Sequence, residues 1–316
     1  INFFNTANVY SDGTSEEIVG RALRDFGRRD ELVIATKLHG RMRNDVNGAG
    51  LSRKAVFTEV DASLKRLGME YIDLYQIHRW DPVVPIEETL EALNDLVRAG
   101  KVLYPAVSNW SAWQTQRAVD LQEHHGWSRL QVTQPMYNLV KRQAEVEILP
   151  MAAANGIGVI PYSPAAAGLL SGKYFTGSNS GRLKSNKMYE ARYGDEWMVE
   201  VAEKFVNFCK QRGLHPVSTA IAWVGAHPAV TAPIVGARNV EQLKDSLAAV
   251  DIKMTPELRA EEGRQAGELL RLDVRECMDL GDCRVEDTFE NRCKAASVIR
   301  RHRPGIILAP YGARMM

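Results

Sequence analysis

The chain has 316 residues, 45% of them hydrophobic and 25% charged, which is enough for one large domain or two smaller ones with a sizeable core. Its net charge of +1, with Lys and Arg spread through both halves, excludes the basic stripe that a nucleic acid or an anionic membrane requires. No apolar run approaches the ~20 residues of a membrane span and the start lacks a secretory signal, so the sequence predicts a cytoplasmic protein with small partners. The four cysteines show no metal-ligand spacing, and we expect neither a metal site nor disulfides.

Short β-branched or aromatic runs alternate along the chain with longer stretches of helical periodicity, the pattern of repeated strand-helix units. Strands are predicted over 2–6, 32–37, 71–77 and 102–107, and near Gln131, Gly158 and Val230. Seven parallel strands are one short of a (β/α)8 barrel, in which polar residues at the strand ends carry the chemistry. An open doubly wound sheet uses the same alternation, so periodicity does not separate the two folds.

The helices between these strands have recognisable boundaries. Thr14 with Glu17 predicts a capping box at the start of the first helix. Ser52 predicts the cap of the second. A helix over 86–98 is expected to stop at Gly100, because glycine adopts the left-handed backbone conformation that ends helices.

Polar residues at three strand ends lie in motifs that resemble one enzyme family. The motifs are FFNTANVY ending in Tyr10, IATK ending in Lys37, and DLYQIH ending in His78. Together with SLKRLGMEYIDLYQIHRWDP over 63–82, they are similar to the aldo-keto reductases, and the resemblance covers residues 1 to about 255. Taken singly, each residue is more often a packing or surface residue, and the case rests on the three together.

The resemblance implies a role for each of these residues in reducing a carbonyl group. Tyr10 would donate the proton, and the ammonium of Lys37 would lower the pKa of its phenol, which is ordinarily near ~10. His78, neutral, would hydrogen-bond the substrate oxygen and orient it.

The resemblance also implies an NADP(H) site. The guanidinium of Arg238 would bind the 2'-phosphate through two hydrogen bonds, and this contact favours NADP(H) over NAD(H). The other expected cofactor-binding residues are Ser108, Asn109 and Gln134 at the carboxamide, Tyr162 under the nicotinamide, Ser163, Ser171 and Gly172 at the pyrophosphate, and Gly236, Gln242, Asp245 and Ser246 at the adenosine.

Two features depart from the family pattern. Asn5 occupies the position of a family aspartate, which removes the carboxylate expected to pair with Lys37, so we expect impaired reduction. Ile1 begins inside the family's second barrel strand, so we expect an N-terminally truncated barrel with seven recognisable strands over 1–255.

The segment 256–316 is expected to be a βαβ-like appendage. From about Glu261 it resembles an interior piece of the LmbE-like (PIG-L) zinc deacetylases, in MDLG at 278–281, RVEDT at 284–288 and ENR at 290–292. The two zinc-binding motifs of that family occur nowhere in the sequence, so we give little weight to the hypothesis of a zinc deacetylase.

The first functional hypothesis is therefore an NADP(H)-dependent reductase of an aldehyde or ketone, weakened by Asn5. The alternatives are a cofactor sensor or regulatory subunit like the potassium-channel beta subunits, or a non-functional chimeric fragment. The sequence leaves the carbonyl substrate and the oligomeric state open.

Overall fold

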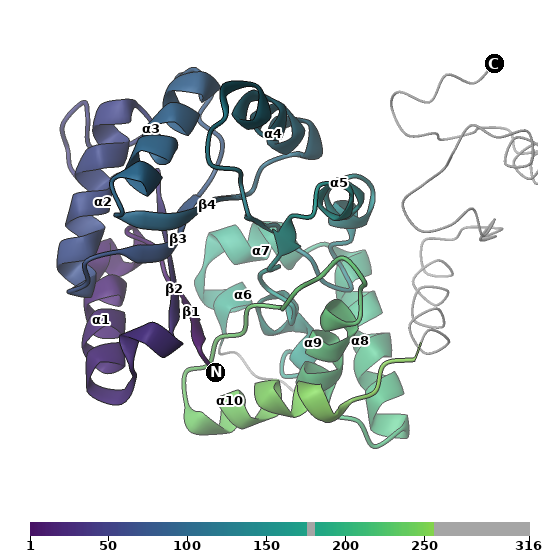
Figure 1. Cartoon of the computed structure of the whole chain (residues 1–316). Helices are drawn as coiled ribbons and strands as arrows, with labels where there is room; N and C mark the ends of the chain where they lie inside the picture. The colour runs from purple at the N-terminus through teal and green to yellow at the C-terminus, as the bar shows by residue number, and fades with distance from the viewer. Residues whose placement is uncertain (176–180, 256–316) are drawn as a thin grey trace, which may run out of the picture. The chain divides into compact units, whose positions relative to one another are not determined.

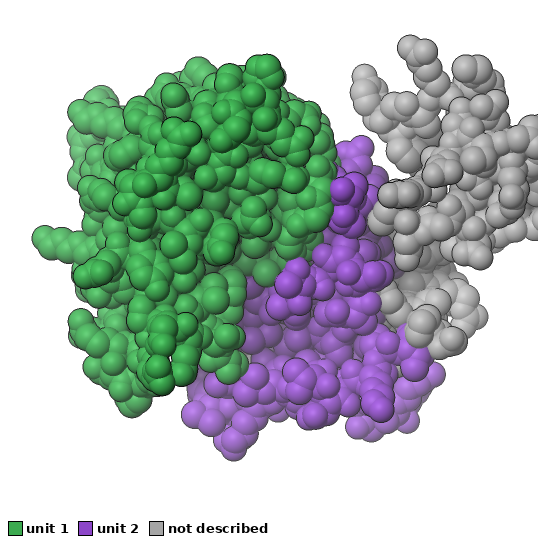
Figure 2. Space-filling view, viewed as in Figure 1, with its two compact units in different colours: residues 1–135, 155–161 green, residues 136–154, 162–316 purple. Residues whose placement is uncertain are grey.

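The computed structural model describes residues 1–175 and 181–255, which belong to two compact units (Figures 1 and 2). Unit 1 comprises residues 1–135 and 155–161, and unit 2 comprises 136–154 and the described residues from 162 onward. The expected appendage over 256–316, with its resemblance to the deacetylases, lies outside the described residues.

Unit 1 contains one six-stranded parallel sheet in which sequence neighbours are spatial neighbours, the order of a curled half-barrel. Its strands are β1 (Phe3–Asn5), β2 (Val33–Leu38), β3 (Ile72–Ile77), β4 (Val102–Ser108), β5 (Val132–Gln134) and β6 (Gly158–Val159). The register pairs Lys37 with Gln76 and Ser108 with Gln134. The parallel sheet was expected, and six of the seven predicted strands form where the periodicity placed them.

The helices of unit 1 follow the strands in turn and pass along the outer side of β1 to β4 (Figure 1). They are α1 (Thr14–Phe26), α2 (Arg53–Leu67), α3 (Ile86–Arg98) and α4 (Ala112–His125), with short 3-10 turns η1 (Tyr10–Gly13) and η2 (Arg29–Glu31). The first three, α1 to α3, lie where the sequence predicts helices.

The helix boundaries test the capping predictions. The Ser52 cap is confirmed, since its hydroxyl accepts a hydrogen bond from the Ala55 amide at 3.3 Å. The stop at Gly100 is confirmed as well, at a φ of 72°. The capping box of Thr14 and Glu17 is wrong: Thr14 is already helical, and Gly13, at a φ of 93°, is the N-cap and has no side chain to accept a hydrogen bond.

The two faces of the sheet have different partners. Ile34, Tyr75 and Ile77 point to the helices and belong to the buried hydrophobic core of unit 1. Because successive side chains of a strand alternate, Lys37 and Gln76 point to the opposite face. That face is also buried, with both residues at 0% exposure, so polar groups there need hydrogen-bond partners within the protein.

Unit 2 is helical. Its elements are η3 (Gln143–Glu145), α5 (Ile148–Ala154), η4 (Ala166–Ser171), α6 (Arg182–Ser185), α7 (Lys187–Tyr193), α8 (Glu196–Gln211), α9 (Pro216–Gly225), α10 (Val240–Leu247) and η5 (Ala248–Asp251). Trp223 of α9 is fully buried, with its ring 5.3 Å from that of Tyr137. Among residues 1–175 and 181–255, no helix has the length and apolarity needed to cross a membrane.

The seventh predicted strand, near Val230, does not form, and the structure corrects that expectation. The Val230 amide donates to the carbonyl of His227 at 2.8 Å, which closes a turn instead of a ladder. Pro228 and Pro233 flank the segment, and neither has an N–H to donate to a neighbouring strand. The apolar residues near Val230 predicted a strand, but Pro228 and Pro233 disfavour ladder pairing there.

Candidate active site

Lys37, near the end of β2, has a fully buried side chain held by two neutral oxygens. Its Nζ donates to the Asn5 Oδ1 at 3.0 Å and to the backbone carbonyl of Thr6 at 2.8 Å. Within the described residues no carboxylate forms an ion pair with this amine. Burial lowers the pKa of Lys37 from its ordinary value to about 7, so the amine is only partly charged at neutral pH. The Asn5 amide thus holds the Lys37 amine by a hydrogen bond, but it carries no negative charge that would favour the ammonium form.

Tyr10 lies beside this amine, in the turn η1 that follows β1. The Lys37 Nζ is 5.1 Å from the centroid of the Tyr10 ring. The centroid of the His78 ring lies 5.7 Å from that of the Tyr10 ring, and the two rings meet edge to face. Tyr10 is 40% exposed. The backbone amide of Tyr10 donates to Ala7 at 3.2 Å, which fixes the turn that brings the phenol to the strand ends. An external molecule can therefore reach a tyrosine that has an amine and an imidazole close to its ring.

His78 follows the last residue of β3, and its backbone amide donates to the Leu38 carbonyl at 3.0 Å. Burial, with a smaller contribution from the positive charges of Lys37 and Arg79, lowers the pKa of the imidazole to about 4. His78 is thus neutral at pH 7, as the expected orienting role requires.

Ser108 and Asn109 link the ends of β3, β4 and β5. The Ser108 hydroxyl donates to the Gln134 carbonyl at 2.8 Å. The Asn109 Nδ2 donates to the carbonyl of His78 and to the Ser108 Oγ, at 3.0 Å each. Asn109 has a φ of 57°, a left-handed conformation that asparagine tolerates better than most residues. The two residues expected at the carboxamide therefore also fix the backbone that carries His78.

Sequence reasoning missed one member of this cluster, Gln76. Its Nε2 donates to the Asn5 Oδ1 at 2.9 Å, and its Oε1 accepts from the Gln134 Nε2 at 3.1 Å. Gln134 also donates to the Asn5 Oδ1, at 3.1 Å. A signal was present, since Gln76 is a polar residue in a mostly apolar strand and precedes His78 by two, the period of one strand face.

The expected pyrophosphate residues of unit 2 lie in two tight turns. Ser163 has a φ of 58°, and its carbonyl accepts from the Asn138 Nδ2 at 2.9 Å. The Ser171 hydroxyl donates to the Gly168 carbonyl at 2.7 Å. Gly172 has a φ of 82°, and a Cβ there would lie 2.9 Å from a methyl group of Val206, so this position requires glycine. Tyr162, next to Ser163, is half-buried and its carbonyl accepts from the Tyr137 amide at 3.4 Å.

The expected adenosine residues of unit 2 lie around the start of α10. Arg238 is exposed, and its guanidinium forms no ion pair or hydrogen bond within residues 1–175 and 181–255. Its backbone amide donates to the Gln242 Oε1 at 3.0 Å. The Asp245 carboxylate lies 3.8 Å from the His215 Nε2, and the Ser246 hydroxyl donates to the Gln242 carbonyl. Gly236 is exposed and has space around it.

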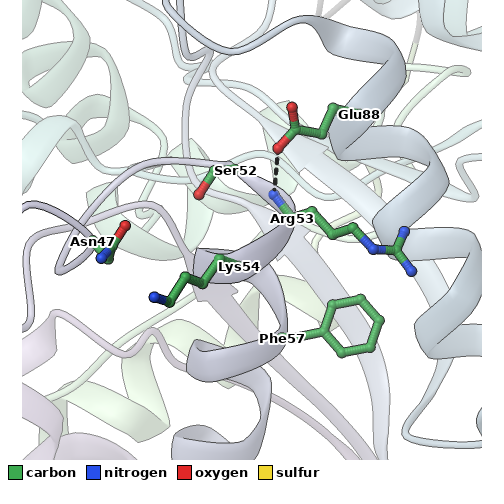
Figure 3. A pocket seen from close by; sticks show the side chains of 6 residues that line it. All are labelled: Asn47, Ser52, Arg53, Lys54, Phe57 and Glu88. Atoms are coloured by element: carbon green, nitrogen blue, oxygen red, sulfur yellow. Dashed lines mark hydrogen bonds between the residues drawn. The ribbon is translucent and has the colours of Figure 1, made fainter.

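A separate open hollow of about 630 Å³ lies at the start of α2 (Figure 3). Glu88 accepts from the Arg53 backbone amide there at 2.8 Å, and the guanidinium of Arg53 lies over the Phe57 ring. Asn47, Ser52 and Lys54 complete the lining, and none of the residues expected in the active site belongs to it. This hollow is a surface feature of the α2 and α3 helices.

Comparison with known proteins decides the family. The model of the aldo/keto reductase family matches residues 1–261, more than four-fifths of the chain. The chain belongs to the aldo/keto reductase family. Oxidoreductase chemistry is therefore its general function.

Several relatives of this aldo/keto reductase align over most of its length. The uncharacterized oxidoreductase YrpG of Bacillus subtilis (strain 168) is 38% identical over 267 residues, which cover 82% of this chain and 80% of that protein. A probable voltage-gated potassium channel subunit beta of Oryza sativa subsp. japonica is 36% identical, covering 82% and 81%. The versiconal hemiacetal acetate reductase of Aspergillus parasiticus is 34% identical, covering 81% and 80%.

Proposed function

We propose that this protein reduces an aldehyde or ketone to an alcohol with NADPH, and that Tyr10 is its proton donor. The observation that carries the proposal is the proximity of the partly exposed Tyr10 to both the Lys37 amine, 5.1 Å from its ring centroid, and the His78 ring, whose centroid is 5.7 Å away. A carbonyl oxygen that becomes an alkoxide needs a proton from a nearby donor, and these three groups supply the donor, its activator and a hydrogen-bonding group.

Each residue has a separate task in this proposal. A charged Lys37 stabilises the phenolate form of Tyr10, which makes the phenol a better acid. His78, neutral because it is buried among positive charges, holds the substrate oxygen beside the phenol. Asn109 keeps His78 in place through its hydrogen bond to the His78 carbonyl.

The residues present fit a nicotinamide cofactor in two respects. Gln134 at the end of β5 has a side-chain oxygen, Oε1, that accepts no hydrogen bond from the described residues and can take one from a carboxamide. Arg238 has a guanidinium without a protein partner among those residues, as a phosphate-binding arginine needs in the free protein. The cofactor, when bound, supplies the hydride. The preference for NADPH over NADH rests on Arg238 and on the family resemblance.

Asn5 makes the proposed reductase weaker than one with a carboxylate at that position. The pKa of Lys37 is about 7, so a large share of the molecules carry a neutral amine at physiological pH. A neutral amine stabilises a phenolate less than an ammonium does.

The direct test combines binding and turnover. We expect NADPH to bind, with quenching or enhancement of its fluorescence, and to be oxidised slowly by a panel of aldehydes. Tyr10→Phe should retain NADPH affinity within about twofold and lose at least about 100-fold in kcat, the range for removal of a general acid. Turnover that survives Tyr10→Phe would contradict the assignment of the proton donor.

A second candidate function is a regulatory subunit that binds the cofactor without using it. Two observations favour it: the similarity to potassium channel beta subunits, and the amide at position 5. This candidate predicts tight NADPH binding with no turnover in the unchanged chain or in Asn5→Asp. Turnover that rises in Asn5→Asp would favour the reductase.

A further inference from the structure

Arg79, the residue after His78, is exposed, and none of the ion pairs within residues 1–175 and 181–255 involves it. Its one hydrogen bond there runs from its Nε to the Nδ1 of His39, at 3.2 Å. The two terminal nitrogens of the guanidinium therefore have no partner in the described part of the chain. An arginine with this side of its guanidinium unoccupied can bind a carboxylate through two parallel hydrogen bonds.

The acceptor that holds Arg79 is a neutral imidazole. Because the Nδ1 of His39 accepts a hydrogen bond from the Arg79 Nε, this ring nitrogen carries no proton. Burial is the largest cause of the lowered pKa of His39 and the charge of Arg79 is the next, so the ring is neutral at pH 7. A carboxylate in this place would offset the charge of the guanidinium. The imidazole fixes the direction of the guanidinium and leaves its charge for a ligand.

His39 adopts a backbone conformation that is costly for a residue with a side chain. It follows β2 directly, with a φ of 116°, and its carbonyl accepts from the Gly50 amide at 3.0 Å. Strained residues of this kind concentrate at functional sites, where the surrounding structure maintains them. The strain is a second observation, independent of the Arg79 contact, that points to this end of the sheet.

Asp81, the acidic residue nearest to Arg79 along the chain, is engaged elsewhere. Its Oδ2 accepts from the Leu51 amide and its Oδ1 from the Val83 amide, at 3.0 Å each. Both carboxylate oxygens therefore hold backbone amides, and Asp81 forms no ion pair with Arg79. The loop after β3 thus keeps its acidic group away from the guanidinium.

Arg79 and His39 lie beside the proposed catalytic groups, after the ends of β3 and β2. The side chains whose charge lowers the pKa of His78 are Lys37, Arg79 and His39, in that order, and all three are bases. A negatively charged molecule that approaches Tyr10 therefore meets a region of positive potential, which attracts it.

We propose that Arg79, held in place by His39, binds a carboxylate of the substrate, so that the preferred substrates are aldehydes or ketones that also carry a carboxylate. This inference rests on the proposed function and names the substrate class that the function leaves open. Arg79 binds a group other than the reacting carbonyl, whose oxygen remains with Tyr10 and His78. It is therefore a specificity-determining residue.

The test compares aldehydes that differ in one group: 3- and 4-formylbenzoate, and the corresponding 3- and 4-formylbenzamide, each reduced with NADPH at pH 7. The carboxylate and the carboxamide have nearly the same shape, and only the carboxylate is charged. In the unchanged chain at least one formylbenzoate should have a kcat/KM about tenfold above that of its amide, because charge-assisted hydrogen bonds are the stronger ones. The difference should lie in KM, since Arg79 contacts the carboxylate equally in the ground state and the transition state.

Two variants remove this preference in different ways. Arg79→Gln removes the charge, and the ratio of the two kcat/KM values should fall to within about twofold. His39→Asp keeps Arg79 but places a carboxylate beside its Nε, at a position where aspartate tolerates a positive φ better than most residues. The guanidinium is then neutralised from within, and the ratio should again fall to within about twofold. A general loss of activity cancels in the ratio, and either variant tests the proposal if the other does not fold.

Arg41→Gln is the matched control. Arg41 is another exposed arginine, two residues after His39, and its guanidinium donates to the backbone carbonyls of Arg43 and Asp45. This variant loses the same charge from a neighbouring loop and should keep the tenfold ratio. A loss of preference in Arg79→Gln then reports a contact and not the net charge of the protein.

The outcomes separate the inference from the proposed function. A ratio near one for both isomers in the unchanged chain, or a tenfold ratio that persists in Arg79→Gln or His39→Asp, would overturn the role of Arg79 while leaving the reductase in place. Absence of turnover on all four aldehydes would overturn the proposed function and the inference together.

Discussion

The Nζ of Lys37 lies 3.0 Å from the Oδ1 of Asn5, so the buried amine at the centre of the candidate site meets an amide. The backbone carbonyl of Thr6 is a second acceptor, so two hydrogen bonds fix the position of the amine. The electrostatics are different from those of an ion pair, because burial lowers the lysine pKa and no negative charge in contact raises it again. Four predictions follow from this relationship and from the surrounding site.

Asn5→Asp should increase turnover and move its pH dependence. A carboxylate within hydrogen-bond distance favours the charged form of Lys37 and raises the lysine pKa above about 7. The ammonium then persists to higher pH, so the alkaline limb of kcat should shift upward by at least about one pH unit, with a rate gain of about tenfold at pH 8. Steady-state reduction of an aldehyde from pH 6 to 10 measures both. An unchanged profile would show that Lys37 does not control the Tyr10 phenol.

Lys37 should also make the folded protein more stable as the pH rises. In the unfolded chain the amine keeps its ordinary pKa of 10.5, and in the folded protein the pKa is about 7. Between these values the unfolded state binds one more proton, so the free energy of unfolding rises with pH by about 1.4 kcal/mol per unit. Urea unfolding at pH 7.5 and 9.5 should show this slope. Lys37→Met should abolish it, and equal slopes in the two proteins would contradict the lowered pKa.

His78 should titrate near pH 4 and respond to Lys37. Burial is the largest cause of its lowered pKa and the charge of Lys37 is the next. Lys37→Met removes that charge and should raise the His78 pKa, though not to its ordinary value of 6.5, because the burial remains. NMR titration of the imidazole follows the change. Arg79→Gln, which removes the next contribution, is the control and should produce a smaller rise; a His78 pKa near 6.5 in the unchanged chain would refute the assignment.

Arg238→Gln should remove the preference for NADPH while leaving the catalytic groups alone. The exposed guanidinium is proposed to bind the 2'-phosphate, and a charge-assisted hydrogen bond of this kind contributes about 1.5–3 kcal/mol. NADPH affinity should fall roughly 10- to 100-fold, with NADH affinity unchanged within about twofold. Lys244→Gln, in the adjoining helix α10 and paired with Glu241 at 3.1 Å, is the matched control and should leave both affinities unchanged. Parallel losses for both cofactors would point to a disturbed helix.

The sequence predicted that Lys37, Tyr10 and His78 gather, because each lies at or after a predicted strand inside its own motif, and the structure places the Tyr10 ring near the other two. The carboxyl ends of parallel strands meet at one edge of the sheet. A prediction of the strands is therefore also a prediction that residues at these ends lie close together. The neutral state of His78 was expected from its role, and the structure supplies the cause in its burial and its positive neighbours.

Other features were beyond the sequence because they depend on competition between local signals. Thr14 and Glu17 have the spacing of a capping box, yet the preceding Gly13 takes the N-cap position in a conformation that side chains disfavour. The segment around Val230 has strand-like residues, but its prolines and the turn at His227 prevent a ladder.

What the sequence determined by itself is the family, the alternation of strands and helices in unit 1, and the identity of the groups at the strand ends, since these depend on residue type and spacing along the chain. What only the tertiary structure decided is the charge and direction of those groups. The pKa of Lys37 near 7 and the hydrogen bonds among Asn5, Gln76 and Gln134 arise because β1, β2, β3 and β5 bring an amine and three amides together on a largely buried face of the sheet. Desolvation and the matching of donors with acceptors act between residues that are up to 129 positions apart in the chain, and no local pattern encodes them.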